Sequence, residues 1–191
     1  ATNISRLKLA RYQLGRDPNG KLCHPYLQRY ETAVLHGQAA LREALRLKQD
    51  GFEPDLIIGH SGFGNTLYLK EAWPKAKFIG YFEWFYRSQG SDVGFGKNQP
   101  ASPDTSLRVH TYNSPIAMDL AQADAAICPT RWQADQFPTA MRQHLSVIFD
   151  GVDTEQLPLV EQNSRHNALA LEAGGVKATI PVDVPLVTYV T

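Results

Sequence analysis

Short apolar runs recur along the chain and predict the strands of a sheet. They lie at residues 55–58, 78–82, 125–128 and 146–149, with polar or turn-forming stretches between them. Runs of this length with few polar positions are typical of buried parallel strands. A partly alternating segment, residues 4–12, predicts one more strand near the start of the chain.

Longer stretches have apolar residues at every third or fourth position, which predicts helices. The predicted helices cover residues 26–50, 66–72, 103–123 and 130–137. Gly51 follows the first of them as a stop signal, and Pro115 is expected to kink the third. Because strands alternate with helices, the sequence predicts an α/β fold with a parallel sheet and right-handed crossovers.

The alternation stops near residue 153, which predicts a domain boundary. Residues 1–153 are expected to form one α/β domain. Residues 154–185 have weak periodicity, three prolines and a Gly174-Gly175 turn, which is typical of a linker that can form a hairpin. Residues 186–191 predict the first strand of a further domain, and the rest of that domain is expected to be missing.

Composition excludes some classes of function. The 19 basic and 19 acidic side chains give no net charge, so no overall field attracts nucleic acid. The two cysteines form no C-x-x-C pair, which is typical of a reduced, cytoplasmic protein. No apolar run reaches the ~20 residues of a membrane span. Histidines and cysteines lack the spacing of a metal site, so no metal or other cofactor is expected.

The loop after the 55–58 strand is the first candidate site. It holds Gly62, Gly64 and Asn65 and connects a strand to a helix, where open α/β sheets bind ligands. The glycines permit close approach of the backbone, and the amides that open the helix suit a polar or anionic group. His60 can exchange a hydrogen bond with a ligand there, although a turn histidine bonded to backbone is an equal alternative.

The same loop has a second interpretation, a nucleophile elbow with Ser61 as nucleophile. Gly59 and Ser61 begin a G-x-S-x-G pattern directly after a strand, as that motif requires. Phe63 occupies the position of the second glycine, where a large side chain would obstruct the turn. An α/β serine hydrolase therefore stays an alternative with one conflicting residue.

An acid among aromatic residues follows the next strand. Glu83 is followed by Trp84 and, two residues later, by Tyr86. A carboxylate beside aromatic faces suits a sugar, which has apolar C–H faces and a rim of hydroxyls; core aromatics beside a solvated acid are the alternative. Thr130 and Arg131 open a helix directly after another strand, which makes Arg131 the basic residue of most interest.

Four segments carry a resemblance to a known family. They are Phe52-x-Pro54-Asp55-Leu-Ile-Ile-Gly-His60-x-Gly62-x-Gly64, Glu83-Trp-Phe-Tyr, Cys128-Pro129-Thr130-Arg131-Trp132-Gln133 and Val147-Ile148-Phe149-Asp150-Gly151-Val152-Asp153-Thr154. Together they resemble the amino-terminal domain of bacterial group 1 (GT4-type) glycosyltransferases. The resemblance spans most of residues 4–154, and its last two segments are the more specific ones.

The resemblance implies a fold and an activity. The fold is a Rossmann-like parallel sheet with helices on both faces, the amino-terminal half of a GT-B fold, here without its first strand and without the second domain. The activity is transfer of a sugar from a nucleotide-sugar donor to a glycan or lipid-linked acceptor, with retention of configuration and without a metal. A lipid-linked acceptor further implies peripheral membrane association of the full-length protein.

The resemblance also implies roles for single residues. Glu83 and His60 are the expected catalytic residues, and a carboxylate at position 83 could stabilise positive charge that develops on the sugar. The expected substrate-binding residues are Gly62, Gly64, Asn65, Trp84, Tyr86, Thr130 and Arg131. The expected hinge residues are Asp150, Gly151 and Asp153. The missing domain would bind most of the nucleotide, so the fragment alone is expected to be inactive; a non-catalytic sugar-binding module remains the other alternative.

Overall fold

The chain divides into two compact units, Ala1–Asp150 and Gly151–Thr191, and each is considered by itself. The computed structural model describes residues 8–18, 23–91, 93, 101–156 and 168–184. The boundary between the units falls at the predicted hinge, next to Gly151.

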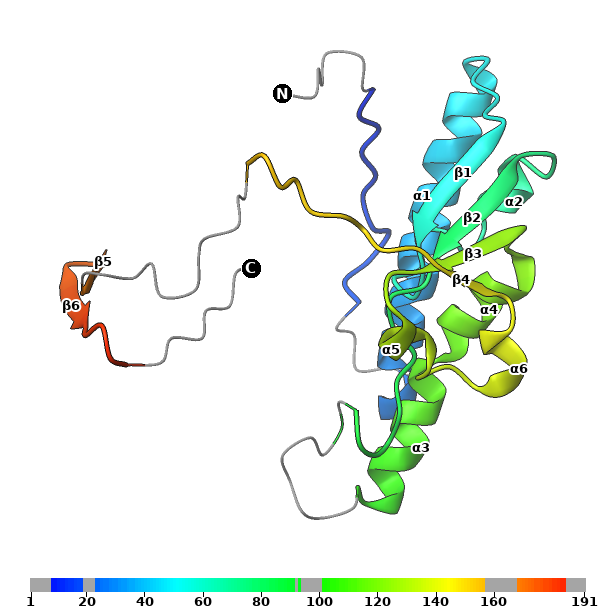
Figure 1. The fold of residues 1–191 in the computed structure, drawn as a ribbon. Helices are drawn as coiled ribbons and strands as arrows, with labels where there is room; N and C mark the ends of the chain where they lie inside the picture. The colour runs from blue at the N-terminus through cyan, green and yellow to red at the C-terminus, as the bar shows by residue number, and fades with distance from the viewer. Residues whose placement is uncertain (1–7, 19–22, 92, 94–100, 157–167, 185–191) are drawn as a thin grey trace. The chain divides into compact units, whose positions relative to one another are not determined.

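The first unit is built on a four-stranded parallel sheet (Figure 1). Its strands are β1 (Leu56–His60), β2 (Lys77–Tyr81), β3 (Ala125–Cys128) and β4 (Leu145–Val147), arranged in the order β1-β2-β3-β4. Ile57 of β1 lies beside Phe78 of β2 in the register of the sheet. The Rossmann-like parallel sheet that the sequence predicts is confirmed.

Helices form in the stretches with helical spacing. They are η2 (Pro25–Leu27, a 3-10 turn), α1 (Gln28–Gln49), α2 (Leu69–Ala72), α3 (Pro103–Tyr112), α4 (Ser114–Gln122), α5 (Arg131–Ala134) and α6 (Thr139–Arg142). α1 ends as predicted at Gly51, whose φ of 86° lies in the left-handed region. The single helix expected over residues 103–123 is instead two helices, with Asn113 between them and Pro115 near the start of the second, where its missing amide hydrogen costs nothing.

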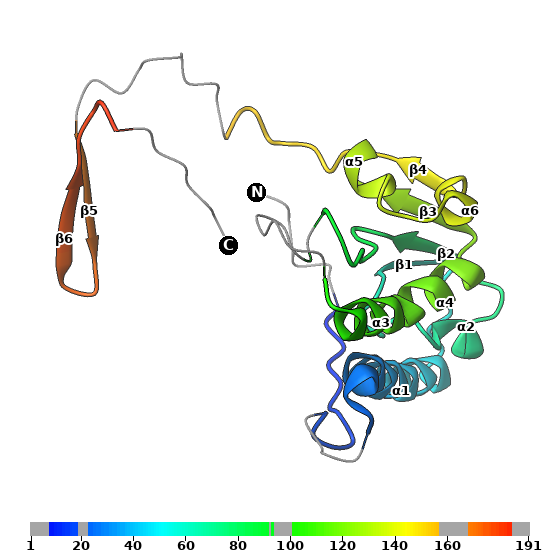
Figure 2. The same cartoon turned by 90° about the horizontal axis from the view of Figure 1, so that it is seen from below.

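The helices between the strands pack on one face of the sheet (Figure 2). Because the strands follow one another in chain order, each right-handed crossover passes over the same side. Ile57 and Phe78 are buried there against Ala44 of α1 and Trp73. A second buried cluster consists of Phe82, Ile116, Ala126 and Phe137. On the opposite face Ile58 is 69% exposed, so among the described residues the expectation of helices on both faces is met on one.

The strand predicted at residues 4–12 is wrong for the part that the structure describes. Residues 8–14 pair with none of the described strands, and Leu9 of the alternating pattern is 75% exposed. The segment instead reaches α1 through Tyr12, whose hydroxyl lies 3.0 Å from Nδ1 of His36 and donates to Oδ1 of Asn65 at 3.0 Å. Side-chain hydrogen bonds, not strand pairing, fix its position.

The second unit contains an antiparallel hairpin. β5 (Leu169–Ala173) and β6 (Val176–Ile180) pair across Gly174 and Gly175, which both have positive φ. This hairpin lies within residues 154–185, where the sequence predicts that one can form. The strand predicted at residues 186–191 lies outside the described residues.

Candidate functional site

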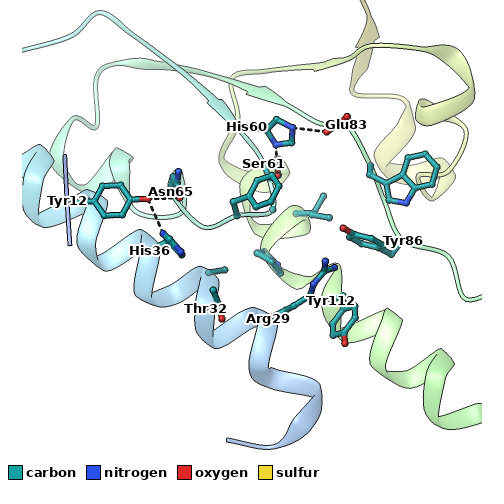
Figure 3. A pocket seen from close by; sticks show the side chains of 16 residues that line it. Tyr12, Arg29, Thr32, His36, His60, Ser61, Asn65, Glu83, Tyr86 and Tyr112 are labelled. Atoms are coloured by element: carbon teal, nitrogen blue, oxygen red, sulfur yellow. Dashed lines mark hydrogen bonds and ion pairs between the residues drawn. The ribbon is translucent and has the colours of Figure 1, made fainter. Parts of the chain in front are cut away.

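A cavity of about 410 Å³ lies at the carboxyl ends of β1 and β2, with α1 on one side and the α3–α4 junction on another (Figure 3). Its size suits a small ligand. Six of the predicted catalytic and substrate-binding residues line it: His60, Gly62, Asn65, Glu83, Trp84 and Tyr86. The two sequence segments that carry these residues are adjacent because their strands are neighbours in the sheet.

His60 and Glu83 form a pair on the wall of this cavity. Nε2 of His60 lies 3.0 Å from Oε2 of Glu83, and Nδ1 lies 3.0 Å from the backbone oxygen of Ser61. Both partners are hydrogen-bond acceptors, so whichever ring nitrogen of His60 carries a proton can donate to one of them. The side chains are 40% and 53% exposed, which leaves both accessible to a ligand.

Asp119 of α4 holds the loop that follows His60. Its carboxylate is fully buried and accepts hydrogen bonds from the hydroxyls of Ser61 at 3.0 Å and Thr66 at 2.9 Å, and from the amide of Gly62 at 3.3 Å. Burial raises the pKa of this carboxyl, and these donors act in the opposite direction. Ser61 is 7% exposed and its hydroxyl is bonded to a carboxylate. Among the described residues no imidazole bonds to this hydroxyl, which gives the hydrolase interpretation no support.

The two loop glycines are required for different reasons. Gly62 has a φ of 91° and lines the cavity beside Ile116. Gly64 has a φ of 94° and lies against α1, where a Cβ atom would come within 1.9 Å of the Ala33 backbone oxygen. Gly64 is not among the residues that line the cavity, so it fixes the loop to the helix instead of facing a ligand.

Aromatic side chains form the wall after β2. Trp84 stacks at a tilt on Trp132 of the α5 segment, with ring centroids 5.0 Å apart. The backbone of Tyr86 is fixed by Asn113, which accepts from the Tyr86 amide and donates to its carbonyl, both at 2.9 Å. The break between α3 and α4 therefore positions the wall of the cavity.

The other two predicted substrate residues lie away from the cavity lining. Thr130 is the N-cap of α5, and its hydroxyl accepts from the amide of Gln133 at 3.1 Å and donates to its side-chain oxygen at 2.6 Å. Arg131 is exposed at the start of the same helix. They contact the site only indirectly, through the neighbouring Trp132 and its stacking on Trp84.

The predicted hinge is tied to the sheet by one side chain. The hydroxyl of Tyr81, at the end of β2, donates to both carboxylate oxygens of Asp150 at 2.9 Å. Burial and this carboxylate raise the pKa of Tyr81 to about 12, so the phenol stays protonated and donates. Gly151 follows with a φ of 84°, and Asp153 accepts at 3.1 Å from the amides of Glu155 and Gln156.

Among the residues that sequence reasoning missed are Asp119, behind the loop, and Arg29, in the cavity lining. Asp119 lies in an amphipathic helix, where an acid is usually solvated. Its spacing could have indicated burial, because Asp119 comes three residues after the apolar Ile116 and lies on the same buried side of the helix. Arg29 lies in the first turn of α1 and lines the cavity between Tyr86 and Tyr112. No local sequence pattern indicates that Arg29 is a site residue.

Among the described residues, no group of three or more His, Cys, Asp or Glu side chains is arranged to hold a metal ion. None of the helices in this part of the chain is long and apolar enough to cross a membrane.

Comparison with known proteins identifies the family. Neither the curated proteins nor the solved structures gave a match. The family model described as glycosyl transferase family 4 group matches residues 1–157, which covers the first unit and the hinge. With the parallel sheet and the cavity at its carboxyl edge, this match shows that the chain belongs to the glycosyl transferase family 4 group.

Proposed function

We propose that the chain is the acceptor-side domain of an enzyme that transfers a sugar from a nucleotide-sugar donor to an acceptor, with retention of configuration and without a metal. One observation supports this most directly. The His60–Glu83 pair lies at the carboxyl ends of two neighbouring parallel strands and faces a cavity with aromatic walls. Ligands of open α/β sheets bind at this edge.

The residues of the cavity suit a reaction that develops positive charge on a sugar. The Glu83 carboxylate can stabilise that charge or accept a hydrogen bond from a hydroxyl, and His60 can donate to an oxygen of the sugar. Trp84 and Tyr86 offer aromatic faces to the C–H faces of a ring. Asn65 adds an amide, while Thr130 and Arg131 would meet larger ligands at the rim.

A second domain would complete the enzyme. In this proposal it follows the hinge at Asp150, Gly151 and Asp153 and binds most of the nucleotide, so the 191-residue chain alone is inactive. The acceptor is a glycan or a lipid-linked precursor, and a lipid-linked acceptor would bring the cytoplasmic full-length protein to a membrane surface. The two free cysteines agree with a reducing compartment.

The test is release of nucleoside diphosphate by the full-length protein from a panel of nucleotide-sugars. Glu83→Gln and His60→Ala are expected to lower kcat by about 10²-fold or more, because the first removes a carboxylate and the second removes a hydrogen-bonding ring from the reacting centre. Glu71→Gln on α2 and His144→Ala after α6, both outside the cavity, are the matched controls and should keep full activity.

Four outcomes of this test would contradict parts of the proposal. Full activity in both Glu83→Gln and His60→Ala would refute the site. Donor binding without turnover would indicate a sugar-binding module. A product with inverted anomeric configuration by NMR, or loss of activity with a chelator, would refute retention or metal independence.

A further inference from the structure

We infer that the cavity takes an acceptor with an anionic group, a carboxylate or a phosphate, and that Arg29 binds this group. The inference rests on the proposed function and specifies the class of its acceptor. It is carried by the position and the partners of Arg29, which none of the sequence motifs involves.

Arg29 is held in the cavity by aromatic rings. Its guanidinium carbon lies 4.9 Å from the ring centroid of Tyr86 and 4.9 Å from that of Tyr112. The two rings are 6.4 Å apart and meet at 80°, so they form a corner that holds the guanidinium on two sides. Figure 3 shows Arg29 extending from α1 to these two rings, apart from the His60–Glu83 pair.

The positive charge of Arg29 has no carboxylate partner among the described residues. The nearest acids along its helix and on α3 are already paired: Glu31 binds Arg16, and Asp104 binds Arg108 at 2.6 Å. Glu83, a carboxylate of the same cavity, is paired with His60. An arginine that lines a cavity without a carboxylate partner is suited to bidentate binding of a carboxylate or a phosphate.

The position of Arg29 in its helix supports the same ligand. Arg29 is the second residue of α1, where the helix macrodipole is positive and disfavours a cation. The rings of Tyr86 and Tyr112 hold the guanidinium of Arg29 in spite of this cost. An anion bound by the guanidinium would offset this cost.

The two ends of the cavity then have separate functions. The His60–Glu83 pair faces the reacting hydroxyl, and Arg29 fixes the acceptor by its charged substituent. Neutral acceptors would lose this second contact. The acceptor is therefore expected to be a uronic acid or a phosphorylated sugar or polyol.

The experiment compares three hexoses that differ at carbon 6. Binding of methyl β-D-glucoside, methyl β-D-glucuronide and methyl β-D-glucoside 6-phosphate to the 191-residue chain is measured by isothermal titration and by NMR shifts of α1 amides. We expect at least one of the two anions to bind about tenfold more tightly than the neutral glucoside, since hydrogen bonds to charged groups are the strong ones. Which anion binds better distinguishes a carboxylate from a phosphate acceptor.

Variants test whether the preference for anionic sugars comes from Arg29. Arg29→Met should abolish this preference, and Arg29→Lys should retain part of it, because the charge is kept. Arg46→Met, the same substitution on the exposed side of the same helix, should leave it unchanged. Circular dichroism establishes that each variant is folded. If Arg29→Met does not fold, a reduced preference for anions in Arg29→Lys provides the test.

Two results would overturn the inference. One is equal affinity of the wild type for the anionic and neutral hexoses, which includes the absence of binding by all three. The other is a preference for anions that survives in Arg29→Met. Binding is measured without a donor, so these results are independent of whether the full-length protein transfers sugar.

Discussion

At the scale of single residues, the loop behind His60 depends on one buried carboxylate. Asp119→Ala removes the acceptor of the Ser61 and Thr66 hydroxyls at a site closed to water. We expect it to lower the free energy of unfolding by about 2–4 kcal/mol, measured by urea denaturation. Asp135→Ala, which breaks an exposed pair with Arg142, should cost under about 1 kcal/mol. Equal effects of the two variants would contradict this prediction.

A second carboxylate makes stability depend on pH. Asp124 accepts from Nζ of Lys77 at 2.7 Å, the Phe78 amide at 2.9 Å and Nζ of Lys70 at 3.3 Å, and these donors hold its pKa well below the usual 3.8. Because the folded state then binds fewer protons than the unfolded state, stability rises with pH in this range. The contribution of Asp124 to stability is fully present above the pKa that this carboxyl has in the unfolded state. It is lost as the pH falls below that pKa.

Urea denaturation of the wild type and Asp124→Asn at a series of pH values checks this dependence of stability on pH. The wild type should be more stable at about pH 7, and the difference should shrink below about pH 4. A difference that is constant, or that grows in acid, would contradict the assignment. Asp135→Asn is the control with an exposed carboxylate.

At the scale of elements, α1 packs on the glycine loop so closely that Gly64 has no room for a Cβ atom. Gly64→Ala would place a Cβ atom 1.9 Å from the Ala33 oxygen, on a backbone with φ of 94°. We expect a loss of roughly 2–4 kcal/mol in the free energy of unfolding. Gly51→Ala has a similar φ of 86° but open space around it, so it should cost only about 1–2 kcal/mol. Similar losses in both would refute the steric argument.

Elements were predictable where the local pattern decides the structure. Helical spacing over residues 26–50 predicts α1, and the apolar run 125–128 coincides with β3. The strand at residues 4–12 fails because alternation alone provides no partner to pair with. Asp119 and Arg29 were missed for a related reason: their roles come from contacts with residues 53 or more positions away.

At the scale of the whole molecule, the first unit contains the core. Every buried apolar side chain of the described residues lies between Ala33 and Phe137, and an isolated hairpin such as β5–β6 is marginal in water. A chain that ends at Asp153 should therefore unfold with a free energy within about 0.5 kcal/mol of the 191-residue chain. A loss of more than about 1 kcal/mol in urea denaturation would show that residues 154–191 stabilise the first unit.

The strand order β1-β2-β3-β4 has a consequence for how the molecule is made. Each strand after the first pairs with the one that precedes it along the chain, so during synthesis every new strand finds its neighbour already present. The sheet can grow by addition at a single edge, without waiting for a late segment to be inserted between strands. Among the described strands, translation from the amino end thus delivers the His60 and Glu83 segments before β3 and β4, and β4 is added last at the edge of the sheet.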